Sequence, residues 1–174
     1  MKYLIAGCLA ALSAAAPVSA EVKSSETNGF VVEQVRTIAA PPAKVWAALL
    51  TPGAWWDPQH SWSGNSANMS LQPVIGGCFC EKLPGSKGEA EHLRIAYIIP
   101  GTLIRLRGGL GPFQAMGVDG ALSWELKEVD GATEFSQTYA VGGYIPGGGK
   151  GFAPIVDQVM TSQIDRLKAF AEKK

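Results

Sequence analysis

The sequence has no excess of charge of either sign. Its 174 residues include 15 Lys and Arg and 15 Asp and Glu, so the formal net charge at pH 7 is zero. Proteins that bind nucleic acids usually carry a positive excess, because contacts with phosphates supply much of their affinity. A few basic residues in the middle of the chain fit the solvated face of a sheet equally well: Lys82, Arg94, Arg105 and Arg107. We therefore predict no nucleic-acid partner.

Residues that bind metals are also scarce. The chain has two histidines and three cysteines, and only Cys78, Cys80 and His92 suggest a soft-metal site. The trio is incomplete and basic residues surround it, so we predict no metal. Residues two apart on a regular strand have Cα atoms roughly 6.5–7 Å apart, which is at the limit for a disulfide. Free thiols are therefore favoured for Cys78 and Cys80, and a strained or bulge-permitted disulfide is the alternative.

A cofactor motif is missing as well. Residues 146–151 (PGGGKG) superficially resemble a phosphate-binding loop. That motif needs a glycine where Tyr144 stands and a serine or threonine where Gly151 stands. We predict no cofactor.

Long apolar runs are absent beyond the N-terminus. There, Lys2 precedes an apolar stretch over residues 4–16, and a small-residue cleavage site ends at Ala20. This order is typical of a secretory signal peptide. The stretch is short for a membrane anchor of roughly 20 residues, and too little apolar sequence precedes Cys8 for a lipoprotein signal. We predict a signal peptide over residues 1–20, cleavage after Ala20, and an exported protein, periplasmic or secreted, without a stable membrane span.

The remaining sequence has the length of one domain. Residues 21–29 are polar and are predicted to form a flexible leader. Neither a linker nor an internal repeat divides residues 30–174, which we predict to be a single folded domain.

Turn signals at residues 84–88 and at Pro100-Gly101 set the register of three strands in the middle of the chain. The predicted pairs are Leu83–Glu89, Phe79–Leu93, Cys80–His92, Tyr97–Ile104 and Ile95–Leu106. Because side chains alternate along a strand, one face is apolar and carries Phe79, Leu93, Ile95, Tyr97, Ile104 and Leu106. The opposite face carries Cys78, Cys80, Lys82, His92, Arg94, Arg105 and Arg107. This is typical of an antiparallel sheet with one covered face.

A second hairpin and a helix follow. The Asp130-Gly131 pair is a strong hairpin signal, and the predicted pairs around it are Leu126–Phe135, Trp124–Gln137, Leu122–Tyr139 and, on the opposite face, Lys127–Glu134. Between residues 152 and 170, apolar side chains recur at three- and four-residue steps, which indicates a long amphipathic helix. The apolar face of the sheet is the surface on which this helix can bury its stripe.

Several motifs occur in a characteristic order: a strand that stops at Pro41-Pro42, a short helix with Val45 and Trp46, the pair Trp55-Trp56, the element Gly76-Gly77-x-Phe79, and YIIPGTLIRLRGGLGP at residues 97–112. Together they resemble the START-like (SRPBCC) superfamily of polyketide cyclases, dehydrases and lipid-transport proteins. The nearest branch in pattern is that of chaperone-ATPase-activator homologues. The resemblance implies an α+β helix-grip fold, in which a curved antiparallel sheet wraps around a long C-terminal helix, with two short helices after the first strand. It also implies a ligand cavity between sheet and helix.

The residues that we predict to bind a ligand are aromatic or lie on the inner face of the sheet. They are Trp55, Trp56, Phe79, Tyr97, Trp124, Gln137, Tyr139 and Tyr144. The amide of Gln137 and the hydroxyls of Tyr97 and Tyr139 are candidates to orient the ligand, because pockets are mostly apolar with a few placed polar groups. Tyr144, in a glycine-rich loop, is a candidate gate. For each inner aromatic residue, ordinary core packing stays open.

No catalytic set can be assigned. Glu81 and Glu91 have inner parity, but we expect them at a solvated rim, and His60 is a lone loop histidine. The leading hypothesis is a binding protein for a hydrophobic or amphipathic small molecule or lipid. An enzyme of the polyketide cyclase or hydrolase type is the second hypothesis, with Glu81 and His60 as its only candidates. A protein-binding or chaperone-assisting module is the third. Oligomeric state is not predicted.

Overall fold

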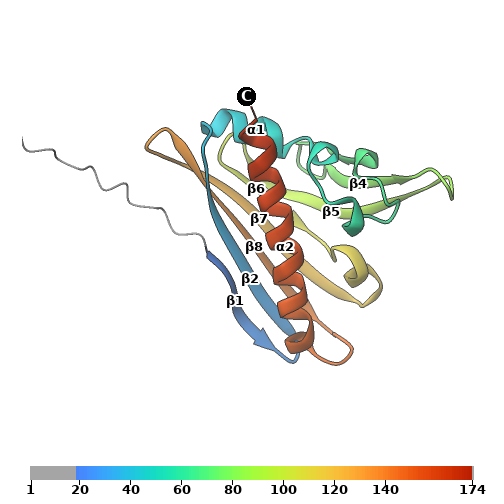
Figure 1. The fold of residues 1–174 in the computed structure, drawn as a ribbon. Helices are drawn as coiled ribbons and strands as arrows, with labels where there is room; N and C mark the ends of the chain where they lie inside the picture. Colours follow the sequence, from blue (N-terminus) through green and yellow to red (C-terminus); the bar gives the residue numbers. More distant parts are fainter. Residues whose placement is uncertain (1–18, 174) are drawn as a thin grey trace, which may run out of the picture.

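A computed structural model describes residues 19–173 (Figure 1). One sheet of eight antiparallel strands has the order β1-β2-β8-β7-β6-β5-β4-β3. The strands are β1 (Ser19–Glu26), β2 (Gly29–Ile38), β3 (Met69–Leu71), β4 (Cys78–Leu83), β5 (Gly88–Ile99), β6 (Leu103–Arg107), β7 (Val118–Val129) and β8 (Ala132–Gly143). The helices are α1 (Pro42–Leu49), the 3-10 turns η1 (Pro52–Ala54), η2 (Pro58–His60), η3 (Ser66–Asn68) and η4 (Gly111–Ala115), and the long α2 (Gly149–Ala171).

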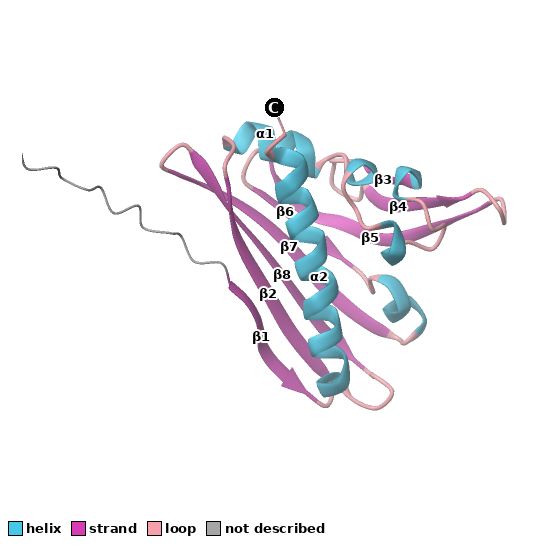
Figure 2. Cartoon of the chain, viewed as in Figure 1, coloured by secondary structure: helices cyan, strands magenta, loops and turns pink. Residues whose placement is uncertain are grey.

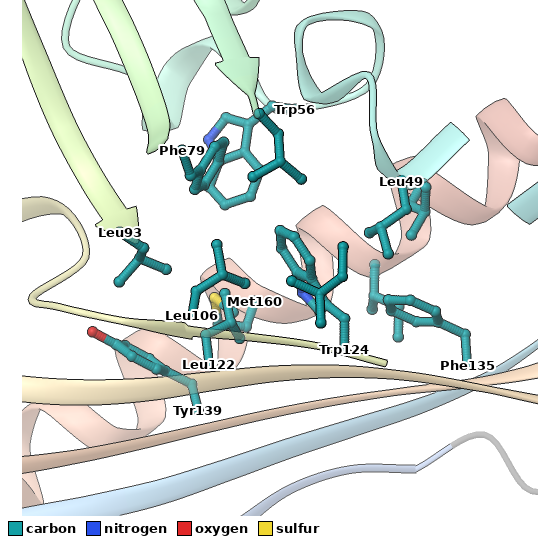
Figure 3. Close-up of a cluster of buried hydrophobic side chains, with 14 of the residues drawn as sticks. Leu49, Trp56, Phe79, Leu93, Leu106, Leu122, Trp124, Phe135, Tyr139 and Met160 are labelled. Atoms are coloured by element: carbon teal, nitrogen blue, oxygen red, sulfur yellow. The ribbon is translucent and has the colours of Figure 1, made fainter. Parts of the chain in front are cut away.

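The curved sheet and α2 form two layers, with α2 lying along one face of the sheet (Figure 2). Met160, Ile164 and Leu167 are buried on the helix side of this interface, and burying each such side chain contributes roughly 1.5–3 kcal/mol. Figure 3 shows Met160 in the same buried cluster as the sheet side chains Leu122 and Tyr139. The predicted helix-grip fold is confirmed. None of the helices within residues 19–173 is long and apolar enough to cross a membrane.

The short helix α1 begins where the prolines predict. Pro41 is the extended residue before the helix and Pro42 its first residue, where a missing N–H breaks no bond. Val45 and Leu49 are fully buried. After α1, where we predicted a second short helix, the chain forms three short 3-10 helices, η1, η2 and η3.

Residues 21–29 are not a loose leader, and this prediction is wrong. Residues 19–26 form β1, which pairs antiparallel with β2 at the edge of the sheet. The polar composition of this segment gave no apolar pattern from which a strand could be predicted. An edge strand is held by backbone hydrogen bonds, which form whatever its side chains are. Val22 is its one apolar residue packed against the core. The predicted cleavage point after Ala20 falls at the second residue of β1.

The predicted register is confirmed between β7 and β8, where Trp124 faces Gln137 and Lys127 faces Glu134. In the middle strands, Phe79–Leu93 and Ile95–Leu106 are confirmed, but the other three pairs are shifted by one residue. The observed pairs are Leu83–Gly88, Cys80–Glu91 and Tyr97–Arg105.

Two irregularities in β5 cause these shifts, at His92 and at Ala96. Each adds one residue opposite the neighbouring strand, so the side chains beyond it change face. His92, predicted to face outward, is buried at 4 % exposure. Tyr97, predicted to face inward, is 46 % exposed, and the Arg105 guanidinium lies 5.9 Å from its ring centroid.

Cys78 and Cys80 form a disulfide, so the prediction of free thiols is wrong. Their Cα atoms are 5.3 Å apart, closer than on a regular strand. The register between β4 and β5 shifts between Phe79 and Cys80. The irregularity therefore accompanies the shortened spacing that a bridge requires. No group of three or more His, Cys, Asp or Glu that could hold a metal gathers within residues 19–173.

Candidate functional site

A pocket of about 420 Å³ lies between α2, η4 and the loop around η2. We call it the α2–η4 pocket. Its lining is mainly apolar and aromatic, and consists of Trp56, Gln59, His60, Ser61, Trp62, His92, Leu110, Gly111, Pro112, Phe113, Tyr139, Phe152, Ile155, Val156, Val159 and Met160. Its volume lies in the range of small-molecule sites. A larger groove with a more polar lining also includes His92 and Trp62 among its residues.

The apolar wall is built by residues from α2 and η4. Phe113 of η4 packs against Phe152 of α2, with 5.5 Å between the ring centroids, and against Phe30 of β2 at 5.7 Å. Phe113 is buried, while Phe152 is only partly buried. Phe152 and Val156, which lies one helical turn further along α2, both line the pocket.

Tyr139 forms part of the wall, but its hydroxyl is already engaged. It accepts a hydrogen bond from the backbone N–H of Leu110 at 2.9 Å and donates one to the carbonyl of Gly108 at 3.3 Å. Burial raises the pKa of Tyr139 to about 12, so the phenol stays neutral. Its role is to hold the loop that leads into η4 and thereby to shape the pocket.

The structure brings only two of the predicted ligand-binding residues to this pocket, Trp56 and Tyr139. Three others lie in the core beneath it: Trp55, Phe79 and Trp124. Figure 3 shows Trp56 beside Phe79, and their ring centroids are 5.2 Å apart. Tyr97 and Tyr144 lie on the surface, at 46 % and 76 % exposure, and neither lines the pocket.

Gln137, predicted to orient a ligand, has its amide fully used within the protein. Its Oε1 accepts from Trp124 Nε1 at 2.8 Å, and its Nε2 donates to Gln34 Oε1 at 3.1 Å and to the carbonyl of Met160 at 3.0 Å. A buried amide with all these partners stabilises the packing of α2 on the sheet. It offers no group to a ligand in this arrangement.

We expect Gln137→Leu to lower the free energy of unfolding by about 2 kcal/mol, because it leaves the Trp124 indole N–H and the side-chain oxygen of Gln34 without a hydrogen-bond partner. Urea unfolding of wild type and variant measures the change. Affinity of the folded fraction for a pocket ligand should remain within about twofold of wild type. A selective loss of affinity at unchanged stability would instead make Gln137 a ligand contact.

A buried carboxylate, Glu81, and a histidine, His92, lie beside the pocket, although we had expected Glu81 at a solvated rim and His92 on the outer face of the sheet. Glu81 is 0 % exposed, and its carboxylate accepts hydrogen bonds from the backbone N–H groups of Trp62 at 3.0 Å and Ser63 at 2.6 Å. His92 Nε2 lies 2.9 Å from Glu81 Oε2. The expectation that Glu81 and Glu91 share a solvated rim is wrong: Glu91 is exposed and pairs with Arg94 on the outer face.

The two groups have opposite preferences for charge. Burial by itself would raise the pKa of Glu81, but hydrogen bonds from Ser63, Trp62 and His92 outweigh it and leave the pKa below the ordinary value of 4.5. Burial lowers the pKa of His92 below 6.5, and the bond to Glu81 opposes this only in part. Near neutral pH, Glu81 is therefore an anion and His92 a neutral imidazole.

His60 is the second histidine of the pocket lining. Its Nδ1 is 3.2 Å from Gln163 Nε2 and 3.6 Å from Asp57 Oδ2. These contacts tie the loop around η2 to α2. The predicted candidate pair, Glu81 with His60, is not what the structure joins, because the partner of Glu81 is His92.

A long helix held in a curved antiparallel sheet, with an apolar pocket between them, defines the START-like helix-grip class. The chain belongs to the polyketide cyclase / dehydrase and lipid transport family, whose model matches residues 29–172. No curated protein matches the sequence. The nearer resemblance to chaperone-ATPase activators stays a prediction.

Solved structures share the fold at low sequence identity. An uncharacterised protein from Rhizobium leguminosarum matches with a TM-score of 0.60 at 18 % identity, over 91 % of this chain and 100 % of its own. CalU16 from Micromonospora echinospora matches with a TM-score of 0.57 at 13 % identity, over 90 % and 87 % of the two chains. DynU16, from the dynemicin biosynthetic locus, matches with a TM-score of 0.58 at 17 % identity, over 82 % and 47 %.

Proposed function

We propose that this protein binds a hydrophobic or amphipathic small molecule in the α2–η4 pocket. The observation that carries the proposal is the pocket itself: about 420 Å³ lined mainly by apolar and aromatic side chains of α2, η4 and the sheet. Transfer of apolar ligand surface from water into such a site is favourable by roughly 25 cal/mol per Å². Membership of a family that includes lipid-transport proteins supports this class of ligand.

Export is part of the proposal. The signal peptide over residues 1–20 rests on the sequence alone and lies almost wholly outside the described residues. The Cys78–Cys80 disulfide supports it, because disulfides persist in oxidising compartments such as the periplasm and the extracellular space. Secreted expression followed by intact-mass measurement would locate the cleavage site, expected after Ala20.

An enzyme of the cyclase type is the second candidate, and the Glu81–His92 pair favours it. A carboxylate that holds a neutral imidazole beside an apolar pocket is an arrangement suited to proton abstraction. DynU16, a fold neighbour, belongs to a biosynthetic locus. The binding proposal does not require a reaction, and ligand turnover would distinguish the two.

Native mass spectrometry of the protein purified from its export compartment is the decisive experiment for ligand binding. We expect a stoichiometric adduct that is released on denaturation and can be identified as a lipid or an aromatic metabolite. A clean apo mass, together with no thermal shift against a panel of hydrophobic metabolites, would refute the proposal.

Filling the pocket should weaken ligand binding. Val156 lines the pocket on α2, and we expect Val156→Trp to weaken binding of the released ligand or of a fluorescent apolar probe by at least about tenfold. The matched control is Val74→Trp, since Val74 is 59 % exposed and lies outside the pocket. Equal affinity of both variants would place the ligand elsewhere.

A further inference from the structure

The hydrogen bonds around Glu81 fix the proton on the His92 ring. Both carboxylate oxygens accept backbone N–H bonds, from Trp62 and Ser63, and Oε2 also faces His92 Nε2 at 2.9 Å. A carboxylate has no proton to give, so the nitrogen that faces it must carry the N–H. The neutral ring is then protonated at Nε2, and Nδ1 holds a free lone pair.

This Nδ1 atom is buried and has no hydrogen-bond partner among the described residues. Buried acceptors in native proteins nearly always have a donor, and His92 lines the α2–η4 pocket. Two hydroxyl groups of the pocket lining already have partners: the Tyr139 hydroxyl bonds Leu110 and Gly108, and the Ser61 hydroxyl donates to the carbonyl of Pro58.

The charges around the pocket exclude one class of amphipathic ligand. Of the described residues that line the pocket, none is Lys or Arg, so a buried carboxylate would find no counter-charge. It would also approach the ionised Glu81 and the lone pair of His92. Burying an unpaired anion is strongly unfavourable.

We propose that His92 Nδ1 is the specificity-determining acceptor of the pocket, so that the pocket selects neutral apolar molecules carrying a hydroxyl or N–H donor. This inference rests on the proposed function. A plain hydrocarbon has no donor for Nδ1, so this atom would stay without a hydrogen bond. A fatty-acid-like anion would be repelled by the ionised Glu81 and by the lone pair of His92. Glu81 is a positioning residue, because it acts by holding the ring and its tautomer.

Three probes with one ring system test the selectivity at pH 7: 2-naphthol, 2-methoxynaphthalene and 2-naphthoate. They offer a donor, no donor and an anion on the same apolar body. By titration calorimetry we expect 2-naphthol to bind about tenfold more tightly than 2-methoxynaphthalene, and 2-naphthoate to bind most weakly. Equal affinities for the three would overturn the inference and leave the binding function intact, whereas no binding of any probe would remove both.

Variants assign the effect to one atom. His92→Phe keeps an aromatic ring but has no acceptor. The ratio of the affinities for 2-naphthol and 2-methoxynaphthalene should therefore fall to about one. His60→Phe changes the other histidine of the pocket and should preserve the ratio, whatever its effect on absolute affinity. A ratio that survives in His92→Phe would overturn the assignment.

A measurement on the unmodified protein covers the case in which His92→Phe does not fold. The long-range ¹H–¹⁵N spectrum of imidazole-labelled protein should show His92 protonated at Nε2 and bare at Nδ1. Addition of 2-naphthol should move the Nδ1 resonance, and addition of 2-methoxynaphthalene should not. A proton on Nδ1 in the free protein would refute the inference directly.

Discussion

Replacement of Glu81 by alanine should lower the free energy of unfolding by about 4 kcal/mol, the effect expected when one partner of a buried polar pair is removed. The carboxylate is fully buried and accepts three hydrogen bonds, from Trp62, Ser63 and His92. Alanine would leave all three donors without a partner and a cavity beneath the loop at residues 62–63. Urea unfolding at pH 7 measures the loss.

Glu81→Gln is the matched control, since it keeps the volume and one carbonyl oxygen. It should be less destabilising than Glu81→Ala, because one of its two polar atoms still accepts. If the two variants are equally stable, or if Glu81→Ala loses less than about 1 kcal/mol, the hydrogen bonds are not what holds this loop.

The same pair predicts how stability depends on pH. Because the folded pKa of Glu81 is lowered below 4.5, its contribution is present above that value and is lost as pH falls through the folded pKa. The pKa of His92 is lowered below 6.5, so the unfolded chain binds a proton there that the folded chain does not. Both effects reduce stability on acidification. Unfolding at pH 7 and pH 4 should show a smaller loss in His92→Phe than in wild type, because the variant removes the His92 contribution and, with its hydrogen bond, part of the lowering of the Glu81 pKa. Asp119 and Glu172, whose pKa values are also lowered, cancel in the comparison.

The elements that could be predicted are those whose signal is local and repeated. The Asp130-Gly131 turn determines the β7–β8 register completely, since no irregularity interrupts that hairpin. The long C-terminal helix follows from its periodic apolar side chains. In both cases the physical constraint lies in one continuous segment, so neighbouring residues reveal it.

The errors arise where one extra residue changes every face beyond it. Strict alternation from Leu93, which faces inward opposite Phe79, places His92 outside, and the irregularity at that residue turns it inward. No residue type near His92 predicts the irregularity, because the irregularity depends on how two strands pair. The edge strand β1 was missed for a similar reason: its partner is β2, and its own side chains are mostly polar.

The candidate site could be predicted only in part. Aromatic composition and fold resemblance led to Trp56 and Tyr139, both of which line the pocket. The parity of Glu81 was predicted, but its burial was not. A loop far from β4 in sequence, at residues 62–63, covers the carboxylate and supplies two of its donors. Such a long-range contact leaves no periodic trace in the sequence.

Gly77→Ala should be the second strongly destabilising change, lowering the free energy of unfolding by about 3 kcal/mol. A Cβ on Gly77 would lie 2.0 Å from the carbonyl oxygen of Gln72 and 2.7 Å from that of Val74. Both neighbours are backbone atoms, so no side chain can move aside. The turn before β4 would have to open.

Opening this turn would also detach it from β5. The carbonyl of Gly77 accepts from the Ile95 N–H at 2.9 Å, and the Gly76 N–H donates to the Ile95 carbonyl at 2.8 Å. Gly76 itself has φ of 74°, a conformation that glycine adopts without strain. The Gly76-Gly77 element that pointed to the family is therefore required by steric fit and by these two bonds.

Gly85→Ala provides the control, because a Cβ there meets nothing within 4 Å and Gly85 lies in the exposed β4–β5 turn. Its unfolding free energy should stay within about 0.5 kcal/mol of wild type. Thermal or urea unfolding of the two variants side by side separates steric exclusion at Gly77 from any general effect of glycine replacement. If Gly77→Ala were as stable as Gly85→Ala, the turn would be able to relax, and close packing would no longer explain why glycine precedes β4.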